Sequence, residues 1–285
     1  MRPEDVPVAE RLSAEGFHEL DTRMYRRSWP EPVLRPAARG ETWVARTLHL
    51  LRTDPGGSWV AEDESGILGV VTSFTRELMW CLATYAVRPG LQGQGIGKPL
   101  LDAALHHGRG CLRGMLCASS DPKAARRYLH AGFTLHPQLF LTGTVERSAI
   151  PLVEKVREGS AADIELMDSL DRRTRGAAHG PDHKVLLSTC RLQVSDSSTG
   201  SGYAYTEANG NLALLAASNR RTAARLLWAV LADASGETLL RHPTPANHWA
   251  VEVGTAARLE LHQDGYLGLR GMKPPAPYVH HGALL

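Results

Sequence analysis

The sequence predicts a mixed α/β (α+β) fold that is present twice in tandem, each copy being a mixed, largely antiparallel sheet flanked by helices. The chain has 285 residues, about twice the commonest domain size of roughly 100–150 residues. Helical and strand-like hydrophobic patterns alternate along its first half. The residue pattern of the first half returns in the second half at a fixed offset of 126 residues.

The composition excludes several classes of protein. A hydrophobic fraction of 43% with 22% charged residues is typical of a packed core. The net charge is only +2 and the basic residues are scattered, so no nucleic-acid partner is expected. No apolar run approaches the roughly 18 residues of a membrane span, and the N-terminus is charged, so we expect a cytoplasmic protein without membrane attachment.

The first elements are two helices followed by an antiparallel sheet. Val8, Leu12 and Phe17 share one face of the first expected helix. Polar turn residues separate the first two strands, and Arg88-Pro89-Gly90 ends the third. The expected helices are Pro7–Leu20 and Thr47–Leu51, and the expected strands are Ser58–Ala61, Ile67–Phe74 and Trp80–Val87.

The rest of the first half alternates helices and strands. Gly108 can end the first of these helices, and Asp121-Pro122 supplies an N-cap and a first-turn proline for the next. The expected order is helix Lys98–His107, strand Cys111–Ser119, a helix to Gly132 and a strand pair around Leu135–Val145. A charged segment follows, so we predict one domain at residues 1–147 and a second at 148–285.

The repeat is clearest between Leu100 and Phe133. At the offset of 126 residues, Leu100 corresponds to Leu226, Asp121 to Asn247 and Phe133 to Leu259, with no gap. Since two helix caps match at the same offset, we interpret the second half as a duplicate of the first.

A glycine-rich loop between the third strand and the following helix is the main candidate site. Backbone N–H groups and the helix dipole can converge there on an anion, and the glycines allow a phosphate to approach. The loop lacks the Lys-Ser/Thr ending of a nucleotide-binding P-loop, and its strand does not open a dinucleotide-binding βαβ unit. The alternative is an ordinary glycine-rich turn. The loop reads Gln92, Gly93, Gln94, Gly95, Ile96, Gly97.

Two motifs resemble those of GNAT-superfamily N-acetyltransferases. Gln92-x-x-Gly95-x-Gly97 is similar to the acetyl-CoA motif of this family. The family's second motif, Asn-x-x-Ala-x-x-x-Tyr-x-x-x-Gly-Phe, is matched from Asp121 through Tyr128 to Phe133, with Asp in place of Asn. The resemblance covers nearly all of residues 1–145 and implies two GNAT folds in tandem.

The resemblance also implies roles for individual residues. The pyrophosphate of acetyl-CoA, the co-substrate, would lie on the amides of Gln92 to Lys98, and the pantetheine arm would pair with Tyr85, Ala86 and Val87. Asp121 takes the first position of the second motif beside the cofactor. Tyr128 would protonate the departing thiolate; the alternative is a core aromatic residue.

The general base is harder to assign, because the strand Trp80–Val87 contains no carboxylate. Glu77 lies nearby, although an exposed hairpin turn is expected for it. The chain resembles tandem-GNAT aminoglycoside acetyltransferases in outline, and these use a terminal carboxylate. The tail Gly282–Leu285 could act in the same way, or it could be an ordinary packed or frayed tail.

The second copy has lost the motif residues. At the same offset, the three loop glycines become Asn219, Arg221 and Ala223, and Tyr128 becomes Gly254. We therefore expect a degenerate domain that walls the acceptor cleft, as in mycothiol synthase-like tandem proteins, with phosphate binding through Arg220 and Arg221 as the alternative.

Neither the cysteines nor the histidines predict a metal site. The four cysteines show no CxxC spacing and are read as reduced core thiols, and the histidines are scattered. The predicted activity is acetyl transfer to a primary amine of a small molecule by direct attack in a ternary complex. The alternatives are a protein or peptide amine as acceptor, or an acetyl-CoA sensor without turnover. A monomer or homodimer is expected.

Overall fold

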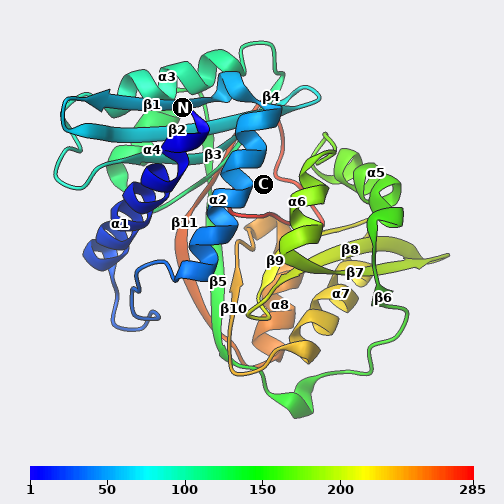
Figure 1. The fold of residues 1–285 in the computed structure, drawn as a ribbon. Coiled ribbons are helices and arrows are strands. Elements are labelled where there is room, and N and C mark those ends of the chain that lie inside the picture. Colours follow the sequence, from blue (N-terminus) through cyan, green and yellow to red (C-terminus); the bar gives the residue numbers. More distant parts are fainter. The chain divides into compact units, whose positions relative to one another are not determined.

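The computed structural model describes all of residues 1–285, and the chain divides into two compact units, Met1–Leu116 and Cys117–Leu285. Figure 1 shows helices packed beside sheets in each unit. Mixed α/β architecture with antiparallel-rich sheets is therefore confirmed.

Two helices begin the first unit. A 3₁₀ turn at Pro3–Asp5 leads into α1 (Val6–Met24), and α2 (Ala37–Thr53) extends well beyond the expected Thr47–Leu51. The expected apolar face of α1 is partly wrong: Leu12 is buried, but Val8 and Phe17 are 37% and 38% exposed. The buried face is instead set by Val6 and Ala9, which pack with Leu12 against the sheet.

The sheet of the first unit contains the predicted antiparallel meander. The strands β1 (Ser58–Asp63), β2 (Gly66–Arg76) and β3 (Met79–Val87) pair in sequence order. The chain then crosses over through α3 (Gly97–His107), so β4 (Arg113–Ala118) runs parallel to β3. The β3–β4 ladder covers Met79 to Leu82 and ends there, while β3 continues to Val87.

The second unit begins with the last elements of the first repeat. The helix α4 (Pro122–His130) is followed by β5 (Thr134–Thr144), a single long strand, so the expected strand pair at Leu135–Val145 is wrong. The partners of β5 come instead from the second half of the chain: β10 (Glu237–Arg241) and β11 (Glu260–Arg270) pair with it antiparallel, one on each side. Figure 1 shows β5 between them.

A second sheet completes this unit, in the order β12-β9-β8-β7-β6. A 3₁₀ turn follows β5 at Arg147–Ala149, and others lie at Ala161–Asp163 and Pro245–Asn247. The strands are β6 (Arg157–Glu158), β7 (Cys190–Ser197), β8 (Gly200–Glu207), β9 (Leu212–Ala217) and β12 (Tyr278–Val279). The helices are α5 (Ile164–Thr174), α6 (Asp182–Thr189), α7 (Arg220–Asp233) and α8 (His248–Ala256).

The structure repeats the same order of elements in both halves: two helices, three strands, helix, strand, helix, strand. The helix α8 and the strand β11 begin and end 126 residues after α4 and β5. The compact units do not divide at the predicted 147/148, because β5 belongs to the first repeat by sequence but pairs with strands of the second.

The two matched helix starts use their cap residues differently. The Asp121 carboxylate accepts a hydrogen bond from the backbone N–H of Lys123 at 2.7 Å, so it caps α4 as predicted. Asn247 does not cap α8 with its side chain. Its side-chain oxygen accepts from the Trp249 indole and from the backbone N–H of Tyr278, so this residue ties α8 to β12 instead.

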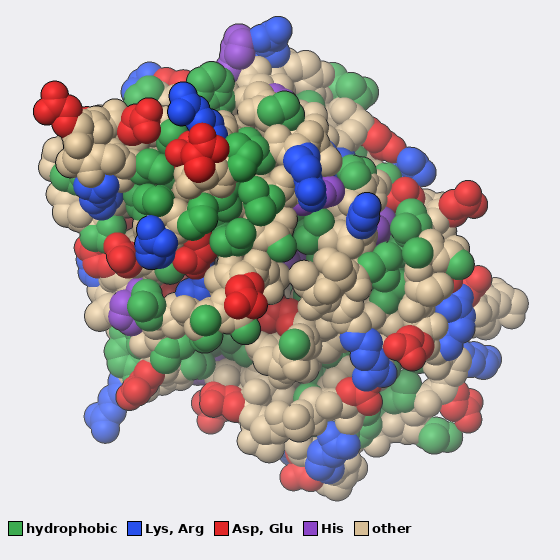
Figure 2. Space-filling model, in the orientation of Figure 1, with side chains coloured by type: hydrophobic (Ala, Val, Ile, Leu, Met, Phe, Trp, Pro, Cys, Tyr) green, Lys and Arg blue, Asp and Glu red, His purple; other side chains and the backbone are tan.

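The surface view agrees with the low net charge. On the face shown in Figure 2, acidic and basic side chains are interspersed and no stripe of one sign appears. No helix has the length and hydropathy needed to cross a bilayer.

Candidate active site

The glycine-rich loop has an open, left-handed backbone. Gly93 and Gly95 both have φ +94°, a conformation that residues with a Cβ rarely adopt. A Cβ added at either position would meet no atom within 4 Å, so the space above the loop is clear. The space beside these two glycines can therefore accept a phosphate group.

The start of α3 has no side-chain cap. Ile96 occupies the N-cap position, where an apolar side chain cannot accept a hydrogen bond, and the first turn contains no acidic residue. The first N–H groups of a helix carry a partial positive charge, so this end favours an anion from outside the chain. The loop and the helix start together have the features of a phosphate-binding site.

The loop is held against the end of β3. The Gln92 side-chain amide donates to the carbonyl of Val87 at 3.2 Å. Gly97 is buried against Tyr85, and a Cβ at this position would overlap the Tyr85 hydroxyl. Tyr85, Ala86 and Val87 lie on the part of β3 beyond the end of its pairing with β4. The predicted cofactor residues from Tyr85 to Lys98 are thus gathered within the first unit.

The remaining predicted site residues lie on α4, in the second unit. Asp121 is the N-cap of the helix, and Tyr128 is only 5% exposed. The Tyr128 carbonyl accepts from the backbone N–H of Phe133 as the helix ends, which fixes the Gly132-Phe133 turn of the second motif. Gly132 has φ +83°, so this turn requires glycine.

The two suggested sources of a general base have well-defined surroundings. Glu77 lies in the exposed turn between β2 and β3 with φ +52°, as the sequence favours. The tail is packed: Leu284 and Leu285 are buried, and the Leu285 carbonyl oxygen accepts from the Tyr278 hydroxyl at 2.8 Å.

The second repeat lacks this geometry. The helix α7 begins at Arg220, three residues before the position that corresponds to Gly97, and the Asn219 side chain accepts from the N–H of Thr222 at 3.0 Å. An extra turn with its own cap therefore replaces the open loop. At the position of Tyr128, Gly254 packs so closely that an added Cβ would lie 2.7 Å from the Leu141 side chain.

A family model for "Acetyltransferase (GNAT) family" matches residues 14–133, which contain both motifs. The chain is thus similar to GNAT acetyltransferases over residues 14–133, and members of this family generally use acetyl-CoA as the acetyl donor. No curated protein sequence matches the chain.

Solved structures extend the GNAT fold to the whole chain. A candidate acetyltransferase from Pyrococcus horikoshii aligns with a TM-score of 0.75 at 17% identity, over 100% of this chain and 93% of that one. A tandem GNAT protein from the clavulanic acid biosynthesis pathway aligns with a TM-score of 0.60 at 13% identity, over 93% and 94% of the two chains. A GCN5-related N-acetyltransferase from Sphaerobacter thermophilus gives a TM-score of 0.58 at 13% identity, over 96% and 95%.

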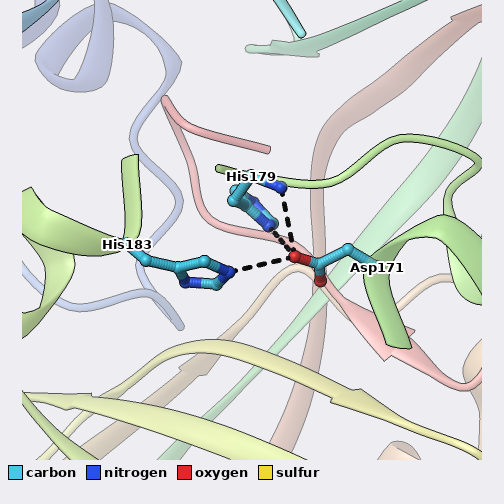
Figure 3. A group of neighbouring side chains, drawn as sticks. All are labelled: Asp171, His179 and His183. Carbon is cyan, nitrogen blue, oxygen red and sulfur yellow. Dashed lines mark hydrogen bonds and ion pairs between the residues drawn. The ribbon is translucent and has the colours of Figure 1, made fainter. Parts of the chain in front are cut away.

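A buried polar cluster in the second GNAT repeat was not predicted from the sequence. Asp171 on α5, His179 in the following segment and His183 on α6 are all fully buried, and both imidazole rings point toward the Asp171 carboxylate (Figure 3). The His179 Nδ1 atom lies 2.7 Å from the Asp171 Oδ2 atom. The signal that sequence reasoning missed is the four-residue spacing of His179 and His183 shortly after two aspartates.

The cluster combines an ionised carboxylate with a neutral imidazole. Burial acts to raise the pKa of Asp171, but its interactions with His179, His183 and Arg175 outweigh burial and hold this pKa well below its usual value. Burial lowers the pKa of His179, and the Arg175 guanidinium lowers it further. The Asp171 Oδ1 atom accepts a hydrogen bond from the Tyr203 hydroxyl.

All four cysteines are free thiols, as expected. Burial raises the pKa of Cys117 and Cys190 to about 11, so both stay protonated at neutral pH. Neither therefore has the character of a nucleophile.

Proposed function

We propose that this protein transfers the acetyl group of acetyl-CoA to a primary amine of a small molecule, by direct attack within a ternary complex, using the first repeat alone. The family match supplies the reaction class. The acceptor class and the site residues are part of the proposal.

The observation that carries the proposal is the contrast between the starts of α3 and α7. The first has no side-chain cap and follows two open glycines with positive φ, whereas the second is capped by Asn219. Both helices occupy the same place in their repeats, so the difference supports the start of the first as the site that would bind the anion. The amides of Gln92 to Lys98 would bind the pyrophosphate.

The β3 strand would hold the arm of the co-substrate. Its last residues, Tyr85, Ala86 and Val87, extend beyond the β3–β4 ladder, which ends at Leu82. An extended pantetheine chain contains amides that can pair with a strand in this way. A main-chain N–H at this end of β3 would stabilise the negative charge that develops on the acetyl oxygen.

Acetyl-CoA supplies an activated thioester, and the chain must supply a proton for the leaving thiolate. Tyr128 would donate this proton, since a phenol stays protonated at neutral pH. Its 5% exposure leaves it well ordered on α4.

The test is a screen of small primary amines for CoA release by the purified full-length protein, with calorimetry of acetyl-CoA binding beside it. We expect turnover with at least one class of amine, and one acetyl-CoA bound per chain. Two equal binding sites per chain would contradict the assignment to the first repeat.

The same screen separates the alternatives. Activity confined to peptides with a free N-terminus would replace the small-molecule acceptor by a protein or peptide. Tight binding of acetyl-CoA without transfer to any amine would indicate a sensor and overturn the proposal.

A further inference from the structure

Three buried side chains of the second repeat, Asp171, His179 and His183, converge on one point, and Asp168 lies at its edge. Asp168 and Asp171 lie three residues apart on α5, so they share a face of that helix. His183 comes from α6, and its Nε2 atom lies 3.3 Å from the Asp168 Oδ1 atom and 3.3 Å from the Asp171 Oδ2 atom. His179 approaches the same Asp171 oxygen, and the ligand atoms of Asp171, His179 and His183 all lie within 4.8 Å of one another.

The outward nitrogen of each imidazole is engaged with an oxygen atom. The His179 Nε2 atom lies 2.8 Å from a main-chain oxygen of Leu285 and 3.2 Å from the donating Arg175 Nη1 atom. The His183 Nδ1 atom lies 3.2 Å from the hydroxyl of Tyr205, which is also 3.8 Å from the Met167 sulfur. Both rings are therefore held from outside, with their other nitrogens turned toward the carboxylates.

The inward nitrogens face carboxylate oxygens, and the 2.7 Å contact of His179 Nδ1 with Asp171 is the length of a normal hydrogen bond. The His183 Nε2 atom is buried and has no partner within good hydrogen-bonding geometry. At 3.3 Å from two carboxylate oxygens, this nitrogen leaves room for a cation that all three atoms can bind. Metal-binding histidines typically have this arrangement, with the second nitrogen held by a carbonyl or another oxygen acceptor.

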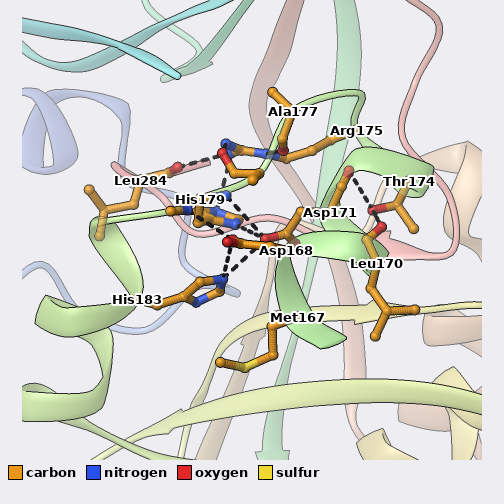
Figure 4. A network of polar contacts seen from close by, with 12 residues as sticks. Met167, Asp168, Leu170, Asp171, Thr174, Arg175, Ala177, His179, His183 and Leu284 are labelled. Atoms are coloured by element: carbon orange, nitrogen blue, oxygen red, sulfur yellow. Dashed lines mark hydrogen bonds and ion pairs between the residues drawn. The ribbon is translucent and has the colours of Figure 1, made fainter. Parts of the chain in front are cut away.

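Arg175 does not occupy the space between these ligands. Its guanidinium donates to the carbonyl oxygens of Ala177 and Ala178 and, through Nη1, to the carbonyl of Leu284 (Figure 4). It also donates to the main-chain oxygen of Leu285, and its Nη1 atom lies 3.2 Å from the outward Nε2 atom of His179. The inward side of the cluster is left to the two carboxylates and two imidazoles.

We propose that Asp168, Asp171, His179 and His183 form a structural site for a divalent transition metal, with Zn²⁺ as the preferred ion. Two imidazole nitrogens and two carboxylate oxygens are ligands that Zn²⁺ accepts in a tetrahedral site. Zinc–ligand bonds of about 2.0–2.2 Å place tetrahedral ligands roughly 3.3 Å apart. The two contacts of His183 already have this spacing. The ion would displace the proton between His179 and Asp171 to solvent, and their 2.7 Å contact must open by about 0.6 Å.

The ion would join α5 to α6. Two aspartates offset its charge, so the filled site is close to neutral. Asp168 retains 17% exposure of its side chain and lies at the edge of the cluster, where an ion can enter. The role is structural, since four protein ligands leave no open position for a substrate.

The experiment measures metal on the full-length protein, independently of acetyl transfer. The chain is stripped with a chelator, dialysed against Zn²⁺ and analysed for bound metal, and Co²⁺ is titrated as a spectroscopic probe. We expect one ion per chain and the visible spectrum of four-coordinate Co²⁺. His183→Gln and Asp171→Asn should lower the affinity more than about 100-fold, and Tyr205→Phe, which removes an outer partner, about 10- to 100-fold.

His248→Gln is the matched control, because His248 is an exposed histidine on α8 and should bind metal like the wild type. If the variants at buried positions fail to fold, the proposal is tested by the Co²⁺ spectrum of the wild type and by the metal affinity of Asp168→Asn, a variant at a more exposed position. A wild type that retains no Zn²⁺ and gives only the spectrum of hydrated Co²⁺ would overturn the proposal, as would unchanged affinity in a folded His183→Gln variant.

Discussion

Gly95→Arg tests the phosphate loop with a control from the same turn. The change copies Arg221, the residue at this position of the second repeat. With φ +94° and no atom within 4 Å of an added Cβ, the variant meets backbone strain but no clash. Strain of this kind costs about 1–3 kcal/mol. At about 2–4 °C per kcal/mol, the melting temperature should fall by several degrees.

The control is Gly90→Arg. Gly90 has φ +79° and open space around it, so its variant carries similar strain and the same added charge. It lies outside the segment Gln92 to Lys98 that we assign to the pyrophosphate. Comparable losses of melting temperature are therefore expected in both variants, while only Gly95→Arg should lose acetyl-CoA.

The expected loss of affinity follows from the hydrogen bonds at stake. An amide bonded to a charged phosphate contributes about 1.5–3 kcal/mol. If the arginine side chain blocks two such bonds, the loss is about 3–6 kcal/mol, or roughly 10²- to 10⁴-fold in Kd. Calorimetry of both variants with acetyl-CoA is the assay. Equal affinities for the two variants would refute the loop assignment, because an added positive charge alone would attract the phosphates.

Three further predictions concern the proposed general acid Tyr128, the buried ion pair of Asp54 and Arg76, and the dependence of stability on pH. Tyr128→Phe removes one hydroxyl from a side chain that is 5% exposed, so the melting temperature should change little. Steady-state acetyl transfer should show turnover reduced about 10²- to 10⁴-fold. Unchanged turnover would make Tyr128 a core aromatic residue. Asp54→Ala removes the carboxylate 2.8 Å from the buried Arg76 guanidinium and should cost about 3–5 kcal/mol in denaturant unfolding. Asp102→Ala breaks the exposed ion pair with Lys98 and should lower the free energy of unfolding by less than about 1 kcal/mol. Equal losses in the Asp54→Ala and Asp102→Ala variants would contradict this account. Burial lowers the pKa of His280 to about 4, below the value of about 6.5 in an unfolded chain. The unfolded state therefore takes up this proton first as pH falls, and stability should decrease between about pH 6.5 and pH 4 by up to about 3 kcal/mol. Thermal melts at stepped pH should show a smaller decrease in His280→Gln, and parallel curves would contradict the assignment.

Local signals predicted the elements around the loop well. The helix α4 begins at Pro122 because Asp121 and Pro122 are both favourable at a helix start, and α3 ends at His107 before Gly108. The buried face of α1 was harder to predict, because Val8 and Phe17 have helical spacing but Val6 and Ala9 are the buried residues. Periodicity alone does not say which side of a helix meets the sheet.

Long-range pairing and the polar cluster could not be predicted in the same way. The partners of β5 are about 100 residues away in sequence, and no local pattern in Thr134–Thr144 specifies them. His179 lies in a connecting segment and His183 on a helix, so their convergence depends on how α5 and α6 pack. The early start of α7 could have been predicted from the sequence, because asparagine at position 219 is a favourable N-cap residue.

The pairing of β5 also bears on why a copy without a phosphate loop persists. The strand belongs to the repeat that carries both acetyltransferase motifs, yet its two neighbours in the sheet, β10 and β11, are encoded by the other repeat. A gene shortened at the repeat boundary would leave β5 with two open edges, and open edges promote aggregation. Mutations that removed the glycine-rich loop from the second repeat would therefore not relax the selection on β10 and β11, because β5 still needs both as neighbours in the sheet. The second repeat would then be retained because it completes the sheet around β5, whatever ligand it binds.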